Sequence, residues 1–153
     1  MKIGIIGAGN VGTGLTKLLL PRGHGLMLSF HKDAEKLKSA AAAFGAHAGT
    51  VAEAVQFRDV VVLATPWVAT AEALGQVGQV PKQKILWDCT NTLKPDMSGL
   101  LIGATTSGGE EVAKLAPWAR VVKAIPPFAE AMRNRSEVGR ERSDLLSLSR
   151  IFT

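Results

Sequence analysis

Three glycines near the start of the chain have a spacing that suits phosphate binding. The stretch "GIIGAGNVG" places Gly7, Gly9 and Gly12 in the order G-x-G-x-x-G, after an apolar run and at the start of a helical pattern. The first glycine allows a tight turn, the second lets the backbone approach a pyrophosphate, and the third lets helix and strand pack closely. Free N–H groups around Asn10 and Val11 would attract the anion together with the helix dipole. This context favours a dinucleotide-binding turn over a purely structural glycine-rich turn.

The stretch "LMLSFHKD", residues 26–33, indicates which dinucleotide the turn would bind. A site that prefers NAD keeps Asp or Glu at this strand end, about 20 residues after the glycines, to bind the ribose 2′-hydroxyl. Here the chain offers Ser29, His31 and Lys32, and Lys36 follows one helical turn later. A 2′-phosphate repels a carboxylate, whereas the two lysines supply positive charge and Ser29 or His31 a hydrogen-bond donor. Each lysine alone could be an ordinary solvated side chain, but together they favour NADP over NAD.

Polar residues also follow a later apolar run. Asp88, Thr90 and Asn91 come at the end of "KILWD", a position where ligands bind in open α/β sheets. The same residue types also close turns with their own side chains, so both interpretations stay open. We interpret Cys89 as a small packing residue and not as a nucleophile. No His, Cys or carboxylate cluster has the spacing of metal ligands, so no metal site is predicted. No acid, base or nucleophile stands out in the sequence either, so no catalytic residue is predicted.

Strands and helices must alternate to position these residues. Apolar runs rich in Val and Ile, typical of parallel strands buried on both faces, occur at 2–7, 25–30, 59–64, 84–88 and 120–125. Helical patterns lie between them at 10–23, 33–45, 50–57 and 107–117. The expected caps are Asp33 and Gly45 for the second helix and the capping boxes Thr50–Glu53 and Ser107–Glu110 for the others. This order predicts an α/β fold with a doubly wound parallel sheet, the Rossmann-like NAD(P)-binding fold.

Composition limits the possible classes of protein. The 153 residues, 46% hydrophobic and 20% charged, suffice for one domain with its own core. A single cysteine cannot form an internal disulfide, and the start of the chain lacks a signal peptide pattern, so we expect a cytoplasmic protein. No apolar run is long enough to cross a membrane. The net charge of +5 is scattered and aromatic residues are few, so neither a nucleic acid nor a membrane is an expected partner.

The last part of the chain differs in composition from the rest. Residues 133–150 read "RNRSEVGRERSDLLSLSR", with five Arg among them. We therefore expect a nucleotide-binding domain over residues 1–132 and an Arg-rich tail, helical or disordered, over residues 133–153.

Five segments together carry a resemblance to a known family. They are "MKIGIIGAGNVGTGL", "SFHKDAEK", "VVLATPW", "DCTNTL" and "PWARVVKAI", spread over about residues 1–125. In order and spacing they resemble the coenzyme F420-dependent NADP oxidoreductases and, more distantly, the pyrroline-5-carboxylate reductases. In that family the turn after the second strand usually reads Ser-Arg and binds the 2′-phosphate. His31 and Lys32 occupy those places here, and Lys36 matches a further basic position. Lys in place of Arg keeps the charge but loses the bidentate geometry.

The resemblance also implies the remaining cofactor contacts. Four residues at the carboxyl end of the strand at 59–64 would lie along the cofactor: Ala64, Thr65, Pro66 and Trp67. Val122 and Ala124 would line the nicotinamide side. Trp67 could instead be a packing residue, the more frequent role of a single Trp.

For function, the resemblance implies hydride transfer between NADP(H) and a flavin-like acceptor such as coenzyme F420, in a homodimer. The segment "IPPF" at 125–128 and the Arg-rich tail depart from the family pattern, and family members generally continue further. Two alternatives therefore stay open. The chain could be a non-catalytic NADP-binding module, or an NADPH-dependent reductase of a small imine or carbonyl substrate.

Overall fold

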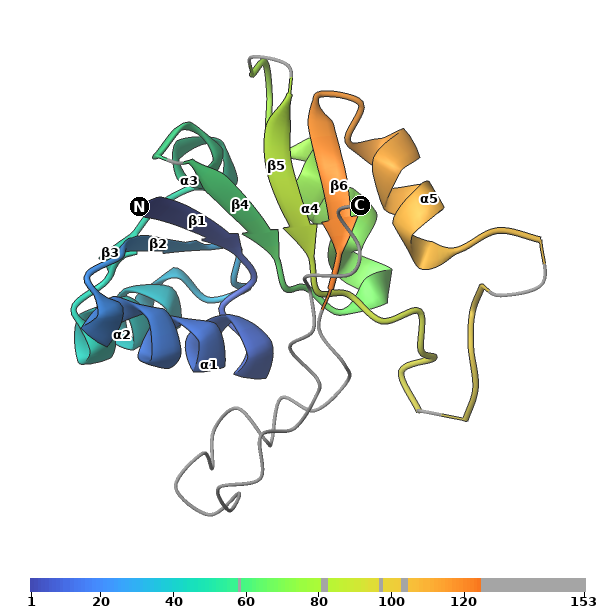
Figure 1. The fold of residues 1–153 in the computed structure, drawn as a ribbon. Coiled ribbons are helices and arrows are strands. Elements are labelled where there is room, and N and C mark those ends of the chain that lie inside the picture. Colours follow the sequence, from blue (N-terminus) through green and yellow to red (C-terminus); the bar gives the residue numbers. More distant parts are fainter. Residues whose placement is uncertain (58, 81–82, 97, 103–104, 125–153) are drawn as a thin grey trace, which may run out of the picture.

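Six parallel strands form one sheet in the computed structural model, which describes residues 1–57, 59–80, 83–96, 98–102 and 105–124. The strands are β1 (Lys2–Ile6), β2 (Gly25–Ser29), β3 (His47–Ala48), β4 (Val60–Leu63), β5 (Lys84–Asp88) and β6 (Ala119–Lys123). They are arranged in the order β3-β2-β1-β4-β5-β6 (Figure 1). The strand order reverses between β1 and β4, as in the Rossmann fold. The predicted doubly wound α/β fold is confirmed.

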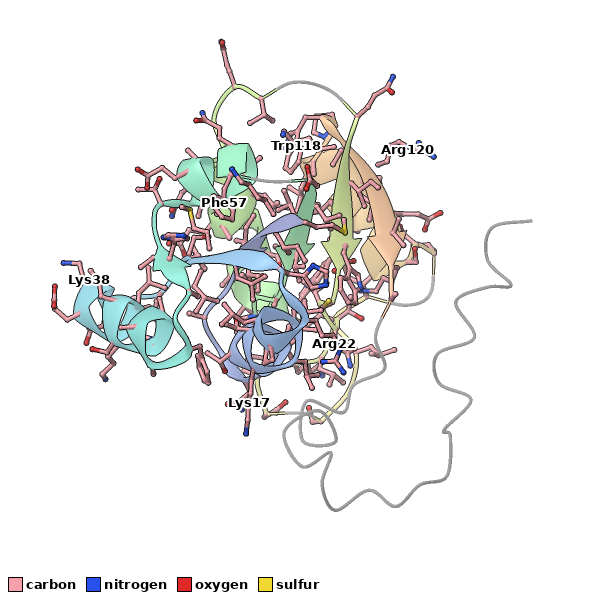
Figure 2. All side chains as sticks on the ribbon, turned by 60° about the vertical axis from the view of Figure 1, so that its left-hand side comes forward. Lys17, Arg22, Lys38, Phe57, Trp118 and Arg120 are labelled. Carbon is pink, nitrogen blue, oxygen red and sulfur yellow. The ribbon has the colours of Figure 1, made fainter. Side chains whose placement is uncertain are left out.

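Helices cover both faces of this sheet (Figure 1). On one face lie α1 (Asn10–Leu19) and α2 (Ala34–Phe44), and on the other lie α3 (Val51–Phe57), α4 (Thr70–Gly75) and α5 (Gly108–Leu115). Short 3-10 turns at Leu20–Arg22 and Trp67–Ala69 follow α1 and precede α4. Lys17 and Lys38 project outward from α1 and α2 (Figure 2). The apolar stripes of the helices thus face the sheet and their charged residues face solvent.

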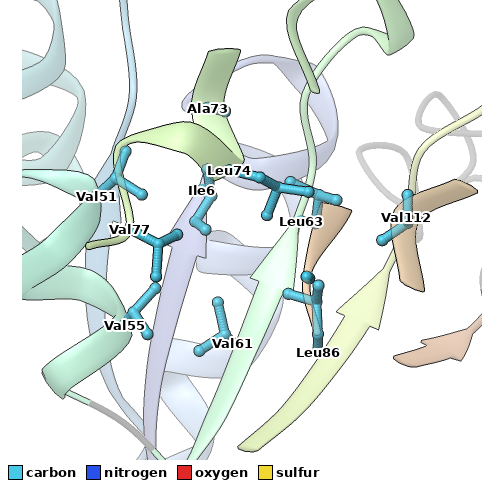
Figure 3. Close-up of a cluster of buried hydrophobic side chains, with 11 residues drawn as sticks. Ile6, Val51, Val55, Val61, Leu63, Ala73, Leu74, Val77, Leu86 and Val112 are labelled. Atoms are coloured by element: carbon cyan, nitrogen blue, oxygen red, sulfur yellow. The ribbon is translucent and has the colours of Figure 1, made fainter. Parts of the chain in front are cut away.

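Alternation along the strands divides the core into two clusters. Ile5 of β1 and Val62 of β4 belong to the cluster under α1 and α2, whereas Leu63 of β4 and Leu86 of β5 belong to the cluster under α3, α4 and α5. Figure 3 shows the second cluster, where Leu63 and Leu86 lie between the helices and the sheet. Both leucines are fully buried. Truncating either to Ala should cost about 2–5 kcal/mol of folding free energy.

Side chains cap three of the helices as the sequence predicts. The Asp33 carboxylate accepts hydrogen bonds from the first turn of α2, and Gly45, with φ +74°, ends that helix. Capping boxes begin α3 and α5, with the pairs Thr50–Glu53 and Ser107–Glu110. Such reciprocal bonds satisfy N–H and carboxylate groups within three residues of each other. The local sequence alone therefore determines where these helices start.

Two elements were not predicted from the sequence. The two-residue strand β3 contains His47 and Ala48, both exposed, and no apolar run marks it. Helix α4 follows the 3-10 turn at Trp67–Ala69 directly and has no side-chain cap. Both elements depend on tertiary contacts, which a local pattern does not encode.

The remaining expectations from the sequence concern the C-terminal tail, membrane-spanning helices and metal sites. The proposed tail at 133–153 and the segment "IPPF" lie outside the described residues, as does the boundary at 132. Among the helices that the structure describes, none is long and apolar enough to cross a membrane. Within the same residues, no group of three His, Cys, Asp or Glu side chains could hold a metal ion.

Candidate dinucleotide-binding site

The fold itself requires two of the three glycines in the turn between β1 and α1. Gly7 has φ +113°, and a Cβ there would lie 2.4 Å from the Ala64 carbonyl oxygen. A Cβ at Gly12 would lie 1.9 Å from the Gly7 carbonyl oxygen. Both distances are far below a van der Waals contact, so β4 and α1 pack directly against the turn. These two positions explain the tight bend and the close approach of helix to strand.

Gly9 differs from its two neighbours because nothing in the described structure fills the space beside it. Its φ of −83° and ψ of −164° are extended and open to any residue. A Cβ at Gly9 would meet no atom of the residues that the structure describes within 4 Å. Folding therefore gives no reason for a glycine here. The open space lies at the N-terminus of α1, where a side chain would obstruct a ligand approaching the backbone.

The N-terminus of α1 also fits an anion. Helix α1 has no side-chain cap and no acidic residue in its first turn. Helices α2, α3 and α5, in contrast, each carry an acid in the first turn. Asn10 is exposed, and the half-buried Val11 packs against the core. Unsatisfied N–H groups and the positive end of the helix dipole are the features that bind a pyrophosphate.

A strained residue joins this turn to the end of β2. Phe30 has φ +58°, an uncommon conformation for a bulky residue. The Gly7 N–H donates to the Ser29 carbonyl at 2.9 Å, and the Ala8 N–H to the Phe30 carbonyl at 3.4 Å. The left-handed bend at Phe30 turns the chain so that His31 and Lys32 follow next to the glycine turn. Sequence reasoning missed Phe30, since no glycine or asparagine marks its conformation.

The Ser29 side chain is hydrogen-bonded within the sheet. Its side chain is fully buried, and its hydroxyl donates to the Ile5 carbonyl at 3.0 Å. The hydroxyl thus already has a partner in this structure. Of the two donors that the sequence suggested for a 2′-phosphate, His31 is the one on the surface.

Exposed basic side chains follow Phe30. The His31 Nδ1 lies 3.0 Å from the Asp33 backbone nitrogen, which fixes the ring beside the N-terminus of α2. Lys36 Nζ lies 3.9 Å from Asp33 Oδ2, and the Asp33 carboxylate itself caps α2. Lys32 is exposed, and no carboxylate pairs with it in the described part of the chain. The structure brings His31, Lys32 and Lys36 to one corner, where Lys32 carries the uncompensated charge.

The segment Ala64–Trp67 follows β4 at the same edge of the sheet. The buried Ala64 lies on the glycine turn, and its N–H donates to the Ile6 carbonyl at 2.8 Å. Thr65 is also buried, and its hydroxyl lies 3.0 Å from that of Thr70. Pro66 is exposed and Trp67 is half-buried. Trp67 packs against the core of α3, α4 and α5, so it is at least partly a packing residue.

The end of β6 lies farther along this edge. Val121 belongs to the cluster on the α3, α4 and α5 face, so alternation places Val122 and Ala124 on the opposite face, the one that α1 covers. Both residues are half-buried. The four strand spacings from β2 to β6 amount to roughly 19 Å. The sequence-predicted residues thus form a line along the carboxyl edge, from the basic corner to Ala124.

Asp88, at the end of β5, is fully buried and fully paired. Its Oδ1 accepts hydrogen bonds from the Thr90 N–H at 2.8 Å and the Thr90 hydroxyl at 2.7 Å. Its Oδ2 lies 2.9 Å from Lys123 Nζ on β6. Of the two interpretations from the sequence, the structure supports the turn closed by its own side chains. The sequence reasoning missed Lys123, which the pairing of β5 with β6 brings to Asp88.

Cys89 is poorly suited to act as a nucleophile. Burial, reinforced by the Asp88 carboxylate and opposed by Lys123, raises the pKa of the Cys89 thiol to about 12. The residue packs against the core under α1 and α2. At neutral pH it is therefore a thiol, in agreement with its interpretation as a packing residue.

The family model for "NADP oxidoreductase coenzyme F420-dependent" matches residues 2–92, more than half of the chain. The chain belongs to this family. The matched range includes the glycine turn, the basic corner and Ala64–Trp67, whereas Val122 and Ala124 lie beyond it. The family is one of oxidoreductases that use NADP, so membership supports binding of NADP(H). No curated protein is detectably similar in sequence to this chain.

Several solved structures are similar to this chain, and one of them has a name from the same family. A candidate F420-dependent NADP reductase from Arthrobacter sp. FB24 is 25% identical with a TM-score of 0.74, and the match covers 89% of this chain and 68% of that one. A hypothetical protein from Sinorhizobium meliloti is 27% identical with a TM-score of 0.71, covering 86% and 64%. A reductive aminase from Aspergillus terreus in complex with NADPH, 22% identical with a TM-score of 0.58, covers 80% and 39% and shows the fold alone. The chain thus spans about two thirds of the length of the first two.

Proposed function

We propose that the protein binds NADP(H) along the carboxyl edge of the sheet, with the pyrophosphate at the N-terminus of α1. The observation that carries this proposal is the open space at Gly9. Gly7 and Gly12 are explained by contacts within the fold, whereas no contact among the described residues explains Gly9. The uncapped N-terminus of α1 supports the same placement. Asn10, Val11 and Gly12 would then present their backbone N–H groups to the phosphates.

The basic corner would bind the ribose 2′-phosphate. Lys32 supplies an ammonium that no carboxylate among the described residues pairs with, Lys36 supplies a second charge, and His31 a ring held beside the N-terminus of α2. A dianionic 2′-phosphate forms charge-assisted hydrogen bonds with such cations, whereas the neutral 2′-hydroxyl of NAD does not. We therefore expect NADP(H) to bind at least about tenfold tighter than NAD(H), which corresponds to about 1.4 kcal/mol.

The proposed reaction is hydride transfer between NADP(H) and a flavin-like acceptor such as coenzyme F420. When bound, the nicotinamide donates or accepts the hydride, and such a transfer needs no protein nucleophile. The site is consistent with that chemistry, because Asp88 is fully paired and Cys89 is a thiol at neutral pH. In the proposal, Ala64–Trp67 lie along the cofactor, and Val122 and Ala124 form a wall for the nicotinamide. The contribution of the protein is then to orient the rings and exclude water.

Rapid mixing of the protein with NADPH and purified coenzyme F420 tests this function. Loss of the deazaflavin absorbance at a rate that depends on protein concentration would support the oxidoreductase. NADPH binding without any change in that absorbance would favour the second candidate, a module that binds NADP but does not react. The observation that favours this candidate is the range of the family match, which ends at residue 92, before Val122 and Ala124. Light scattering on the same sample would test the proposed homodimer.

A further inference from the structure

We infer that Trp87, Asp88, Thr90 and Lys123 form a two-sided clamp that positions the nicotinamide wall at the end of β6. The inference rests on the proposed function, because it assigns a role to residues that hold Val122 and Ala124 in place. None of the four side chains is a catalytic residue in this account. They are positioning residues, because they hold Val122 and Ala124 in place.

An ion pair forms the clamp on the α5 side of the sheet. Asp88 and Lys123 are directly opposite each other in the register of β5 and β6. Lys123 Nζ donates to Asp88 Oδ2 at 2.9 Å and to the Thr90 carbonyl at 2.6 Å. It also lies 3.4 Å from the Thr90 hydroxyl. One ammonium therefore joins β6 both to β5 and to the start of the loop after β5.

The Asp88 end of this ion pair cannot relax into water. The carboxylate is fully buried, whereas the Lys123 side chain is 43% exposed. A buried carboxylate that loses its cation is left with an uncompensated charge. The pair thus strongly favours the position of β6 in which Lys123 reaches Asp88.

An indole forms the clamp on the opposite face. Trp87 Nε1 donates to the Ala124 carbonyl at 2.9 Å. The Ala124 N–H donates to the Asp88 carbonyl at 3.2 Å. Ala124 is therefore held through both of its backbone polar groups, and Val122 is paired with Trp87 in the strand register.

The position of β6 explains why a clamp matters there. Among the described strands, β6 is the last in the sheet and pairs only with β5. An edge strand lacks hydrogen bonds on one side, so its end opens more easily than the end of a central strand. The clamp joins the Lys123 side chain and the Ala124 backbone to β5 and to the start of the loop that follows it. It therefore fixes the backbone beside the proposed nicotinamide position, far from the basic corner at β2.

The distance between the two ends of the site supplies the test. Adenosine 2′,5′-bisphosphate contains the basic-corner ligand and a phosphate but no nicotinamide, whereas NADPH contains all three. Replacing Lys123→Met removes the ion pair, and Trp87→Phe removes the indole donor while keeping a ring. We expect each variant to lower the affinity for NADPH at least about threefold and to leave the affinity for adenosine 2′,5′-bisphosphate unchanged. Fluorescence of the bound nicotinamide should change in the same variants.

Two further variants separate positioning from stability. Lys114→Met breaks a surface ion pair with Glu111 on α5 and should leave the affinity for both ligands unchanged. Lys123→Arg keeps a cation beside Asp88 and should restore most of the NADPH affinity. If Lys123→Met and Trp87→Phe lower the affinity for both ligands equally, the inference is wrong. It is also wrong if the affinity for both ligands stays unchanged. If Lys123→Met fails to fold, Trp87→Phe alone decides between these outcomes.

The failure of the proposed function would look different. In that case the parent protein itself would bind neither NADPH nor adenosine 2′,5′-bisphosphate. Parent binding of both, with no selective effect in the variants, would contradict the clamp alone.

Discussion

Replacing Gly9→Ala should separate cofactor binding from folding. The new methyl group would meet no atom of the described residues within 4 Å, and the backbone of Gly9 is already extended. The methyl group would therefore occupy the space that we assign to the pyrophosphate. The prediction is a protein that folds like its parent and binds NADPH poorly.

The expected magnitudes follow from the local geometry. Gly→Ala at a compatible conformation stabilises by about 0.4–1 kcal/mol, and the loss of glycine at an N-cap costs a similar amount, so the melting temperature should change by less than roughly 4 °C. Hydrogen bonds to a charged group contribute about 1.5–3 kcal/mol each. If the methyl group displaces the phosphate from one or two N–H groups, NADPH affinity falls by at least about tenfold.

Calorimetry with two ligands and one control variant makes this test sharp. Adenosine 2′-monophosphate lacks the pyrophosphate, so Gly9→Ala should bind it like the parent. Gly12→Ala should instead destabilise the fold, because its Cβ would lie 1.9 Å from the Gly7 carbonyl oxygen. Its melting temperature should therefore drop. If Gly9→Ala binds NADPH with parental affinity and melts like the parent, the phosphate does not lie against this turn.

Two further predictions concern protonation. Because the pKa of Cys89 is about 12, alkylation of this single cysteine by iodoacetamide should accelerate about tenfold per pH unit up to at least pH 10; a plateau near pH 9 in the folded protein would contradict the burial argument. Hydrogen bonds from the Ser107 backbone, and then from the side chains of Ser107 and Thr106, lower the pKa of Glu110. The ionised carboxylate therefore stabilises the fold above the unfolded-state pKa, and this contribution is lost as the pH falls through the lowered folded-state value. The difference in melting temperature between parent and Glu110→Gln should be largest near pH 7 and should shrink below about pH 4; a difference independent of pH would refute this sign.

The parts of the fold that the sequence predicted correctly depend on local interactions. Asp33 and Ser107 satisfy N–H groups two or three residues away, so each helix start is encoded within one turn. The glycine spacing is likewise local, and the structure gives Gly7 and Gly12 the close contacts that such a turn requires. The long apolar runs predicted five of the strands, since buried parallel strands need no alternation.

The parts that the sequence did not predict depend on residues far apart in the chain. Lys123 reaches Asp88 across 35 positions, and only the register of β5 and β6 brings them together. Ser29 looks like a free donor until β1 places the Ile5 carbonyl beside its hydroxyl. Phe30 adopts its left-handed conformation because the glycine turn bonds to the backbone on both sides of the bend. In each case a tertiary contact overrides the local preference of the residue.

The preference for NADPH over NADH tests the central claim most directly. Calorimetry on the parent should give an affinity for NADPH at least about tenfold higher than for NADH. Lys32→Asp should reverse that order, because it places a carboxylate where the 2′-phosphate would bind. Lys17→Asp makes the same change in net charge at the far end of α1, where Lys17 projects outward (Figure 2), and should keep the parental order. Equal affinities of the parent for the two nucleotides, or an unchanged order in Lys32→Asp, would contradict the account.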